Sequence, residues 1–172
     1  AEALAGHRLR IAKVLSAVGA LALASLAVAH ATVGAWPLMI LNMVLSSLLG
    51  STAWNLHRQR PPWVPFLALF LGLIAALAYS IYLQGFLGVL WSFPAMFLSH
   101  FILPPRQARP LSVLLLLTVS VSSYVSLGPF VTLRVVLSLG FVLLMIHVVL
   151  QVLGELQRAM VAQAITDPLT GS

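Results

Sequence analysis

The chain has 172 residues, of which 61% are hydrophobic and only 7% are charged. Its mean hydropathy of +1.07 lies far outside the range of soluble globular domains, so the expected solvent of the protein is a lipid bilayer. The absence of cysteine excludes disulfides, thiolate metal sites and cysteine nucleophiles. The net charge of +6 does not indicate a nucleic-acid partner, because the basic residues fall between apolar segments, where they signal topology.

Six apolar segments follow one another along the chain, at residues 11–29, 37–55, 64–82, 86–103, 111–127 and 131–153. Each has about the 17 to 25 residues that cross a hydrocarbon core as a helix, and none alternates like an outer-membrane strand. We therefore predict an all-α integral membrane bundle of six transmembrane helices within residues 1–153, surrounded by lipid. Pro94 should kink the fourth helix and free a carbonyl near Leu90.

Basic residues occur before the first predicted span, in every second connection between spans and after the last span, which places them all on one side of the membrane. They are Arg8, Arg10, Lys13, Arg58, Arg60, Arg106, Arg109 and Arg158, whereas the connections at 30–36, 84–85 and 128–130 contain no Lys or Arg. Cytoplasmic loops of membrane proteins are enriched in Lys and Arg. The pattern predicts a multi-pass protein with both termini in the cytoplasm.

Arg134 is a basic residue inside the outer half of the last predicted span. The acidic residues of the chain, which are Glu2, Glu155 and Asp167, are expected at or beyond the cytoplasmic face, so no carboxylate reaches this depth. One interpretation is that Arg134 snorkels to lipid phosphates at the outer surface. The other is that it binds a small anionic ligand in an outward-open pocket, with neutral hydrogen-bonding residues near the same depth. These residues are His30, Asn42, Tyr79, Gln84 and Tyr124.

Two further ionisable residues, His100 and His147, are predicted at comparable depth nearer the cytoplasm. Two intramembrane histidines could ligate haem axially or hold a metal ion. The alternative is that each hydrogen-bonds a neighbouring helix, because no His-x3-His or Glu-x2-His spacing places two ligands on one helix face.

A polar helix is predicted to continue the last span into the cytoplasm over residues 154–166. Its apolar residues Val149, Leu153, Leu156 and Met160 are spaced by four, three and four, which is typical of a short coiled-coil seam. The segment is therefore interpreted as a signalling helix that pairs with its copy in a parallel homodimer. The alternative is that the last span ends in one or two exposed amphipathic turns.

The chain ends in Thr166-Asp167-Pro168-Leu169-Thr170-Gly171-Ser172, directly after this polar helix. Thr-Asp-Pro-Leu-Thr-Gly in this position resembles the start of the GGDEF domain of bacterial diguanylate cyclases. The apolar part is similar, in this arrangement, to the membrane-associated sensor (MASE-like) domains of such enzymes. The GGDEF loop itself would lie beyond Ser172, so the resemblance implies that residues 1–172 are non-catalytic and that GTP and Mg²⁺ bind only in the following domain.

This resemblance implies a sensory and dimerisation domain in the bacterial inner membrane, which regulates a cytoplasmic diguanylate cyclase in cyclic di-GMP signalling. Hydropathy alone would fit equally well a six-helix solute-binding membrane subunit of a transporter. Such a subunit has no need of a helix that ends in residues of the GGDEF type, so we favour the sensor.

Overall fold

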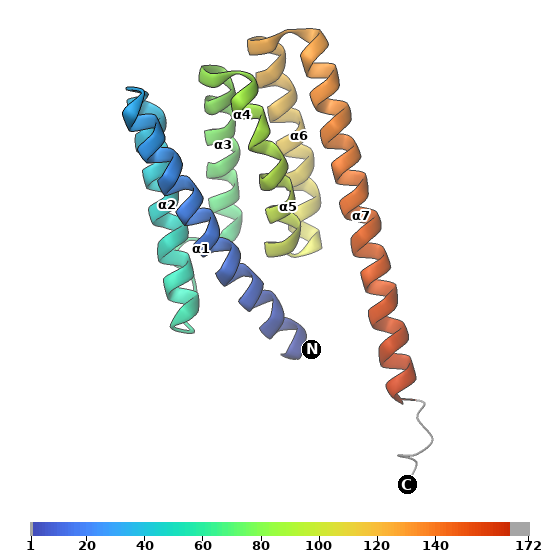
Figure 1. The fold of residues 1–172 in the computed structure, drawn as a ribbon. Coiled ribbons are helices and arrows are strands. Elements are labelled where there is room, and N and C mark those ends of the chain that lie inside the picture. Colours follow the sequence, from blue (N-terminus) through green and yellow to red (C-terminus); the bar gives the residue numbers. More distant parts are fainter. Residues whose placement is uncertain (1, 166–172) are drawn as a thin grey trace.

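The computed structural model describes the backbone of residues 2–165 and the side chains of residues 10–160 (Figure 1). The helices are α1 (Glu2–Thr32), α2 (Trp36–His57), α3 (Phe66–Gln84), α4 (Phe86–Leu90), α5 (Ser92–Ile102), α6 (Pro105–Leu127) and α7 (Pro129–Ile165). The described part of the chain contains no strand, which confirms the predicted all-helical class.

In the described part of the chain, five helices are long and apolar enough to cross a membrane. They are Arg10–Thr32, Trp36–His57, Phe66–Gln84, Pro105–Leu127 and Pro129–Met160. The segment predicted as one further span at 86–103 is instead a shorter apolar unit, Phe86–Ile102, which is divided into α4 and α5 at Trp91. The division lies where Pro94 prevents a regular helix, because its ring clashes with the carbonyl of Leu90, four residues earlier. The predicted kink is therefore present as a break.

The helices run up and down, so that the connections gather at two ends of the bundle (Figure 1). The α1–α2, α3–α4 and α6–α7 connections lie at one end, which we call the turn end. Gly85 and Gly128 close α3 and α6 there with φ angles of +59° and +82°, which side chains other than glycine rarely adopt. Each of these two turns is consequently a single residue long.

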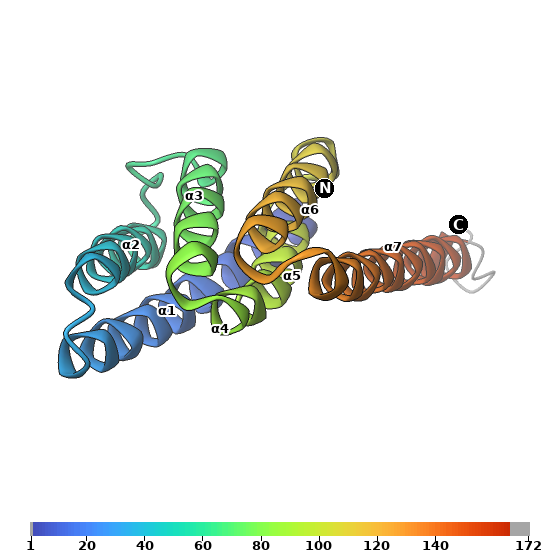
Figure 2. The ribbon, with the colours of Figure 1, turned by 90° about the horizontal axis from the view of Figure 1, so that it is seen from above.

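Buried side chains form two clusters. The larger joins α3, α5, α6 and α7 and includes Phe70, Ile74, Leu77, Met96, Leu115, Val119 and Leu139. The smaller, around Leu23, Leu45 and Ala76, joins α1 and α2 to α3. α1 and α2 pack mainly on each other, whereas α7 packs on α5 and α6. Seen from above, α2 and the end of α1 that joins it lie on the opposite side of the bundle from α7, whereas the N-terminal part of α1 crosses towards α5 and α6 (Figure 2).

α4 lies directly against the backbone of α3. A Cβ atom on Gly88 would be 2.6 Å from the backbone nitrogen of Ile81 and 2.7 Å from the carbonyl carbon of Ser80. Contacts this short do not occur for real side chains, so only glycine permits the observed packing. Gly88 thereby fixes α4, and with it the start of α5, close to the last turns of α3.

α7 is one unbroken helix of 37 residues, which corresponds to about 55 Å at 1.5 Å per residue. Its C-terminal part extends beyond the other helices (Figure 1). The residues of the predicted seam, which are Val149, Leu153, Leu156 and Met160, are all exposed on this helix. The predicted GGDEF junction, which comprises Asp167, Pro168, Leu169, Thr170 and Gly171, lies outside the described residues.

Candidate functional site

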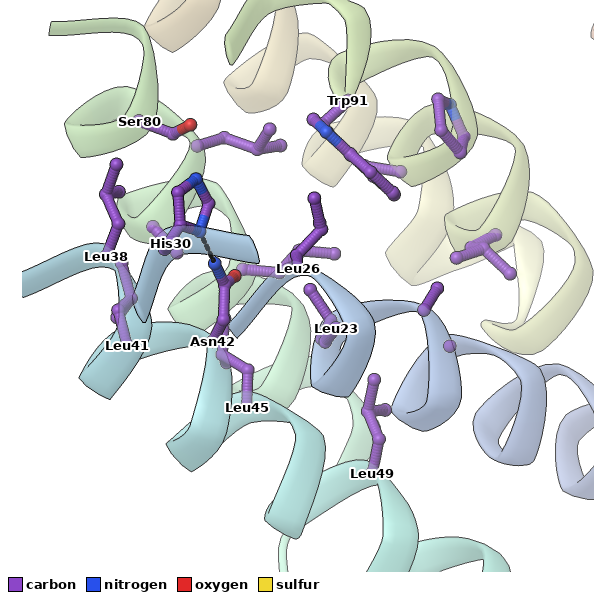
Figure 3. A pocket seen from close by; sticks show the side chains of 18 of the residues that line it. Leu23, Leu26, His30, Leu38, Leu41, Asn42, Leu45, Leu49, Ser80 and Trp91 are labelled. Carbon is purple, nitrogen blue, oxygen red and sulfur yellow. Dashed lines mark hydrogen bonds between the residues drawn. The ribbon is translucent and has the colours of Figure 1, made fainter. Parts of the chain in front are cut away.

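His30 is the centre of a hydrogen-bonded group at the turn end of the bundle. It lies near the end of α1 and is only 8% exposed. Its Nδ1 atom is 3.0 Å from the amide nitrogen of Asn42 on α2, and its Nε2 atom is 2.5 Å from the amide nitrogen of Gln84 on α3. Ser80, one turn before Gln84, donates its hydroxyl hydrogen to Gln84 Oε1 over 3.3 Å. Polar contacts at one imidazole ring thus connect three helices, and Figure 3 shows the contact between His30 and Asn42.

The protonation of this group follows from its hydrogen-bonding capacity. A neutral imidazole has one N–H donor and one acceptor nitrogen, so the two amides cannot both donate to it. Because Gln84 Oε1 already accepts from Ser80, Gln84 donates through Nε2 to Nε2 of His30. His30 Nδ1 then carries the hydrogen, and the amide of Asn42, whose nitrogen faces Nδ1 in the structure, would have to turn by 180° to accept it through its oxygen. Both ring nitrogens are therefore engaged within the protein.

A cavity extends from this polar group along α1, between α1, α2, α3 and α5 (Figure 3). The volume of this cavity is about 100 Å³. Its walls are mainly apolar and are formed by Gly19, Ala22, Leu23, Leu26, Leu38, Leu41, Leu45, Leu49, Leu73, Ala76, Leu77, Trp91, Pro94, Ala95 and Leu98. The cavity is consequently polar at the turn end and apolar along the rest of its length.

A second cavity of about 40 Å³ continues the apolar part. It shares Gly19, Leu23, Leu45, Leu49, Leu73 and Leu98 with the first. Ser16 is its polar lining residue, and Phe66, Leu69 and Phe70 contribute to its wall. Among the described residues that line the two cavities, none is Asp, Glu, Lys or Arg.

The six residues predicted to form one pocket are divided between different places. His30, Asn42 and Gln84 are brought together, and all three line the larger cavity. Tyr79 and Tyr124 are exposed and do not line it. Of the predicted pocket residues, His30, Asn42 and Gln84 thus form the polar end of the cavity.

Arg134 is likewise separate from the cavity. It is exposed on α7, with its guanidinium carbon 4.6 Å from the centre of the Phe130 ring. The physical reason for the separation is that α7 packs on α5 and α6, on the side of the bundle opposite α2 and the connection between α1 and α2 (Figure 2). Residues at equal depth on helices that are not neighbours do not meet, so Arg134 does not complete the polar group at His30.

His100 on α5 and His147 on α7 are in contact, as their predicted depths allow. Their ring centroids are 5.5 Å apart and the rings meet edge to face, with 75° between their planes. Each ring donates Nδ1–H to a carbonyl of its own helix over 3.0 Å, His100 to Met96 and His147 to Leu143. This leaves both Nε2 lone pairs free, the tautomer that metal-ligating histidines adopt.

The histidine pair has few further ligands. In the described part of the chain, no group of three or more His, Cys, Asp or Glu side chains is placed to hold a metal ion. The hydroxyl of Ser112 lies 3.5 Å from both ring nitrogens of His100, at the limit of a hydrogen bond. The geometry thus supports helix packing through the two rings, and the haem or metal role remains a prediction.

Some residues of the site were not expected from the sequence. Ser80 could have been found, because it precedes Gln84 by four residues and therefore shares its helix face. Trp91 gave no such signal, since its place in the cavity wall results from the break between α4 and α5.

A polar contact also joins α1 to α2 at the other end of the bundle. There Lys13 Nζ donates to Nδ1 of His57 over 2.8 Å.

Fold and site together define a helical protein with helices long and apolar enough to cross a membrane, and with a cavity that is polar at one end. Comparison of the chain with known protein families, with curated proteins and with solved structures finds no match. The function is therefore argued from the residues themselves.

Proposed function

We propose that this chain is the membrane sensory and dimerisation domain of a bacterial diguanylate cyclase, in which it regulates a cytoplasmic GGDEF domain that converts GTP to cyclic di-GMP. The observation that carries the proposal is the unbroken course of α7 from Pro129 to Ile165. At about 55 Å this helix exceeds the roughly 30 Å hydrocarbon core of a bilayer. It is suited to link the bundle rigidly to residues 167–171, which resemble the start of a GGDEF domain.

In this proposal the chain crosses the inner membrane six times, with α4 and α5 together as the fourth crossing. The described basic residues other than Arg134 lie on the helices and connections at the end opposite the turn end. They are Arg10, Lys13, Arg58, Arg60, Arg106, Arg109 and Arg158. An excess of Lys and Arg favours a cytoplasmic location for that end, so both termini are assigned to the cytoplasm, where GTP is available.

The exposed seam on α7 provides the dimer contact in this proposal. Val149, Leu153, Leu156 and Met160 present apolar surface where α7 leaves the bundle. A second copy of the helix would bury these side chains in a parallel pair. A diguanylate cyclase acts through two GGDEF domains that face each other, so a change in the angle or rotation of the paired helices would alter its output.

Two experiments test this proposal. The coding sequence beyond Ser172 is expected to specify a GGDEF loop, and a stop codon there would remove the main support. In the full-length protein, Leu156→Glu is expected to reduce cyclic di-GMP output in membranes, because it places a charge in the seam. Gln157→Glu adds the same charge to the neighbouring exposed residue, which is outside the seam, and serves as the control. Equal output from the two variants would contradict the role of the seam.

A solute-binding subunit of a transporter is the second candidate, and the cavity between α1, α2, α3 and α5 is the observation that favours it. Uptake by proteoliposomes that contain the chain distinguishes the two functions. Uptake dependent on the cavity residues would favour a transporter, whereas a sensor is expected to bind without moving the ligand across the membrane.

A further inference from the structure

We propose that the cavity below His30 binds a small uncharged amphiphile, that is, a molecule with one hydrogen-bonding head such as a hydroxyl or carbonyl and a slender apolar body. The head would lie against Asn42, Gln84 and Ser80, and the apolar body would follow α1 towards Gly19. This inference depends on the cavity alone and does not require that the protein regulates a cyclase.

The absence of charge in the described lining sets the class of head group. A buried carboxylate or phosphate needs a cationic partner to offset its loss of hydration. The described residues that line the cavity include no Lys or Arg, and both ring nitrogens of His30 are already engaged with Asn42 and Gln84. Arg134 lies on α7, which is not part of the cavity wall. An anionic head would therefore be buried without a counter-charge, whereas a neutral head avoids this cost.

The polar group retains capacity to bind such a head. Each amide uses one of its two polar atoms on the His30 ring, and Gln84 uses the other on Ser80. The second polar atom of Asn42 and the acceptor lone pairs of Ser80 Oγ remain. A hydroxyl can both donate to and accept from these atoms, and a carbonyl can accept from the Asn42 amide.

The apolar part sets the size and orientation of the ligand. His30 and Gly19 are eleven residues apart on α1, or about 16 Å along the helix axis, which is roughly half the thickness of the hydrocarbon core. A dry cavity of about 150 Å³ is known to hold benzene, so a space of about 100 Å³ suits an apolar body no larger than benzene, such as a short alkyl chain. The polar end lies at the turn end, so the ligand would have the orientation of an amphiphile in one leaflet.

Photolabelling of the full chain in phosphatidylcholine nanodiscs tests the proposal. The probe is a short-chain alcohol that carries a diazirine, with pentanol and pentanoate as competitors at a pH where pentanoate is ionised. Labelling is expected to saturate, to map by mass spectrometry to the walls on α1, α2, α3 and α5, and to be displaced by pentanol but not by pentanoate. Unsaturable labelling over the lipid-facing surface, or equal displacement by pentanoate, would overturn the proposal.

Three variants locate the binding. Asn42→Leu is expected to weaken labelling about two- to tenfold, which is the loss of affinity expected when one hydrogen bond to the ligand is removed. Ala22→Leu leaves the polar group intact and is expected to block the apolar part, so it remains informative if Asn42→Leu does not fold. Gln151→Leu removes an exposed amide on α7 and is the control that should label like the original chain. Labelling that is the same in all three would overturn the proposal, whatever lies beyond Ser172.

Discussion

Replacement of Gly88 by alanine tests the packing that holds the turn end together. The added Cβ atom would lie 2.6 Å from the backbone nitrogen of Ile81, whereas ordinary contact begins at 3.4 Å. α4 must therefore move by about 0.8 Å, which is 3.4 minus 2.6. The opposing atoms belong to the backbone of a helix, so they cannot rotate away as the end of a side chain can.

The magnitude follows from two opposing effects. Overpacking of a buried contact costs about 1 to 3 kcal/mol in the free energy of unfolding. The higher helix propensity of alanine returns at most about 1 kcal/mol. Gly88→Ala is therefore expected to destabilise the protein, and the displacement of α4 should also disturb Trp91 and weaken ligand binding in the cavity.

The assay is unfolding in detergent micelles by titration with SDS, followed by the loss of helical circular dichroism. Gly72→Ala is the matched control, because Gly72 is an internal glycine of α3 whose added Cβ atom would have nothing within 4 Å. Its free energy of unfolding is expected to be unchanged or slightly raised. If Gly88→Ala were as stable as Gly72→Ala, α4 would not be packed against α3 in the way described.

Three further predictions concern topology, association and Arg134. Reporter fusions after Gly34 should behave as periplasmic and fusions after Arg60 as cytoplasmic, and the reverse pattern would contradict the assigned orientation. The chain contains no cysteine, so Leu153→Cys should form a disulfide-linked dimer in isolated membranes treated with a copper–phenanthroline oxidant, whereas Gln157→Cys should not if the seam forms the contact. Arg134→Lys should keep regulated cyclase output, because a lysine reaches the same lipid phosphates, and loss of regulation would instead indicate a bidentate anion site.

The sequence predicted the helices well because the length of an apolar segment is a local property. It also located the interruption near Leu90, since the effect of Pro94 acts within its own helix turn. The close contact of α4 with α3 was not predictable, because the letters Phe86-Leu87-Gly88 do not show which backbone lies beside the glycine. That information depends on tertiary packing.

The candidate site illustrates the same limit. Depth in the membrane can be estimated from the position of a residue along its span, and this estimate grouped His30, Asn42, Gln84 and Arg134 at a similar depth. Which helices are neighbours cannot be read in this way. The first three residues lie on packed helices and meet, whereas α7 is held by α5 and α6 and places Arg134 elsewhere.

α5 is the element through which the cavity could influence α7. Pro94, Ala95 and Leu98 line the cavity, and His100 on the same helix contacts His147 on α7. Gly88 holds α4 and the start of α5 against α3, so a ligand in the cavity would act on the part of α5 that follows the break at Trp91. A ligand that displaces α5 would therefore shift α7 directly, without passing through α1 or α2.

This route predicts that binding and regulation can be separated. His100→Leu removes the ring contact with α7 but lies outside the cavity wall, so it should leave photolabelling by the alcohol probe unchanged. In the full-length protein the same variant should lose most of the change in cyclic di-GMP output that the alcohol produces, because displacement of α5 would no longer reach His147. Ser47→Ala, which removes only an exposed hydroxyl bonded to its own helix, is the control. Normal regulation in His100→Leu would show that the signal reaches α7 by another path, for which the remaining route is the core shared by α3 and α6.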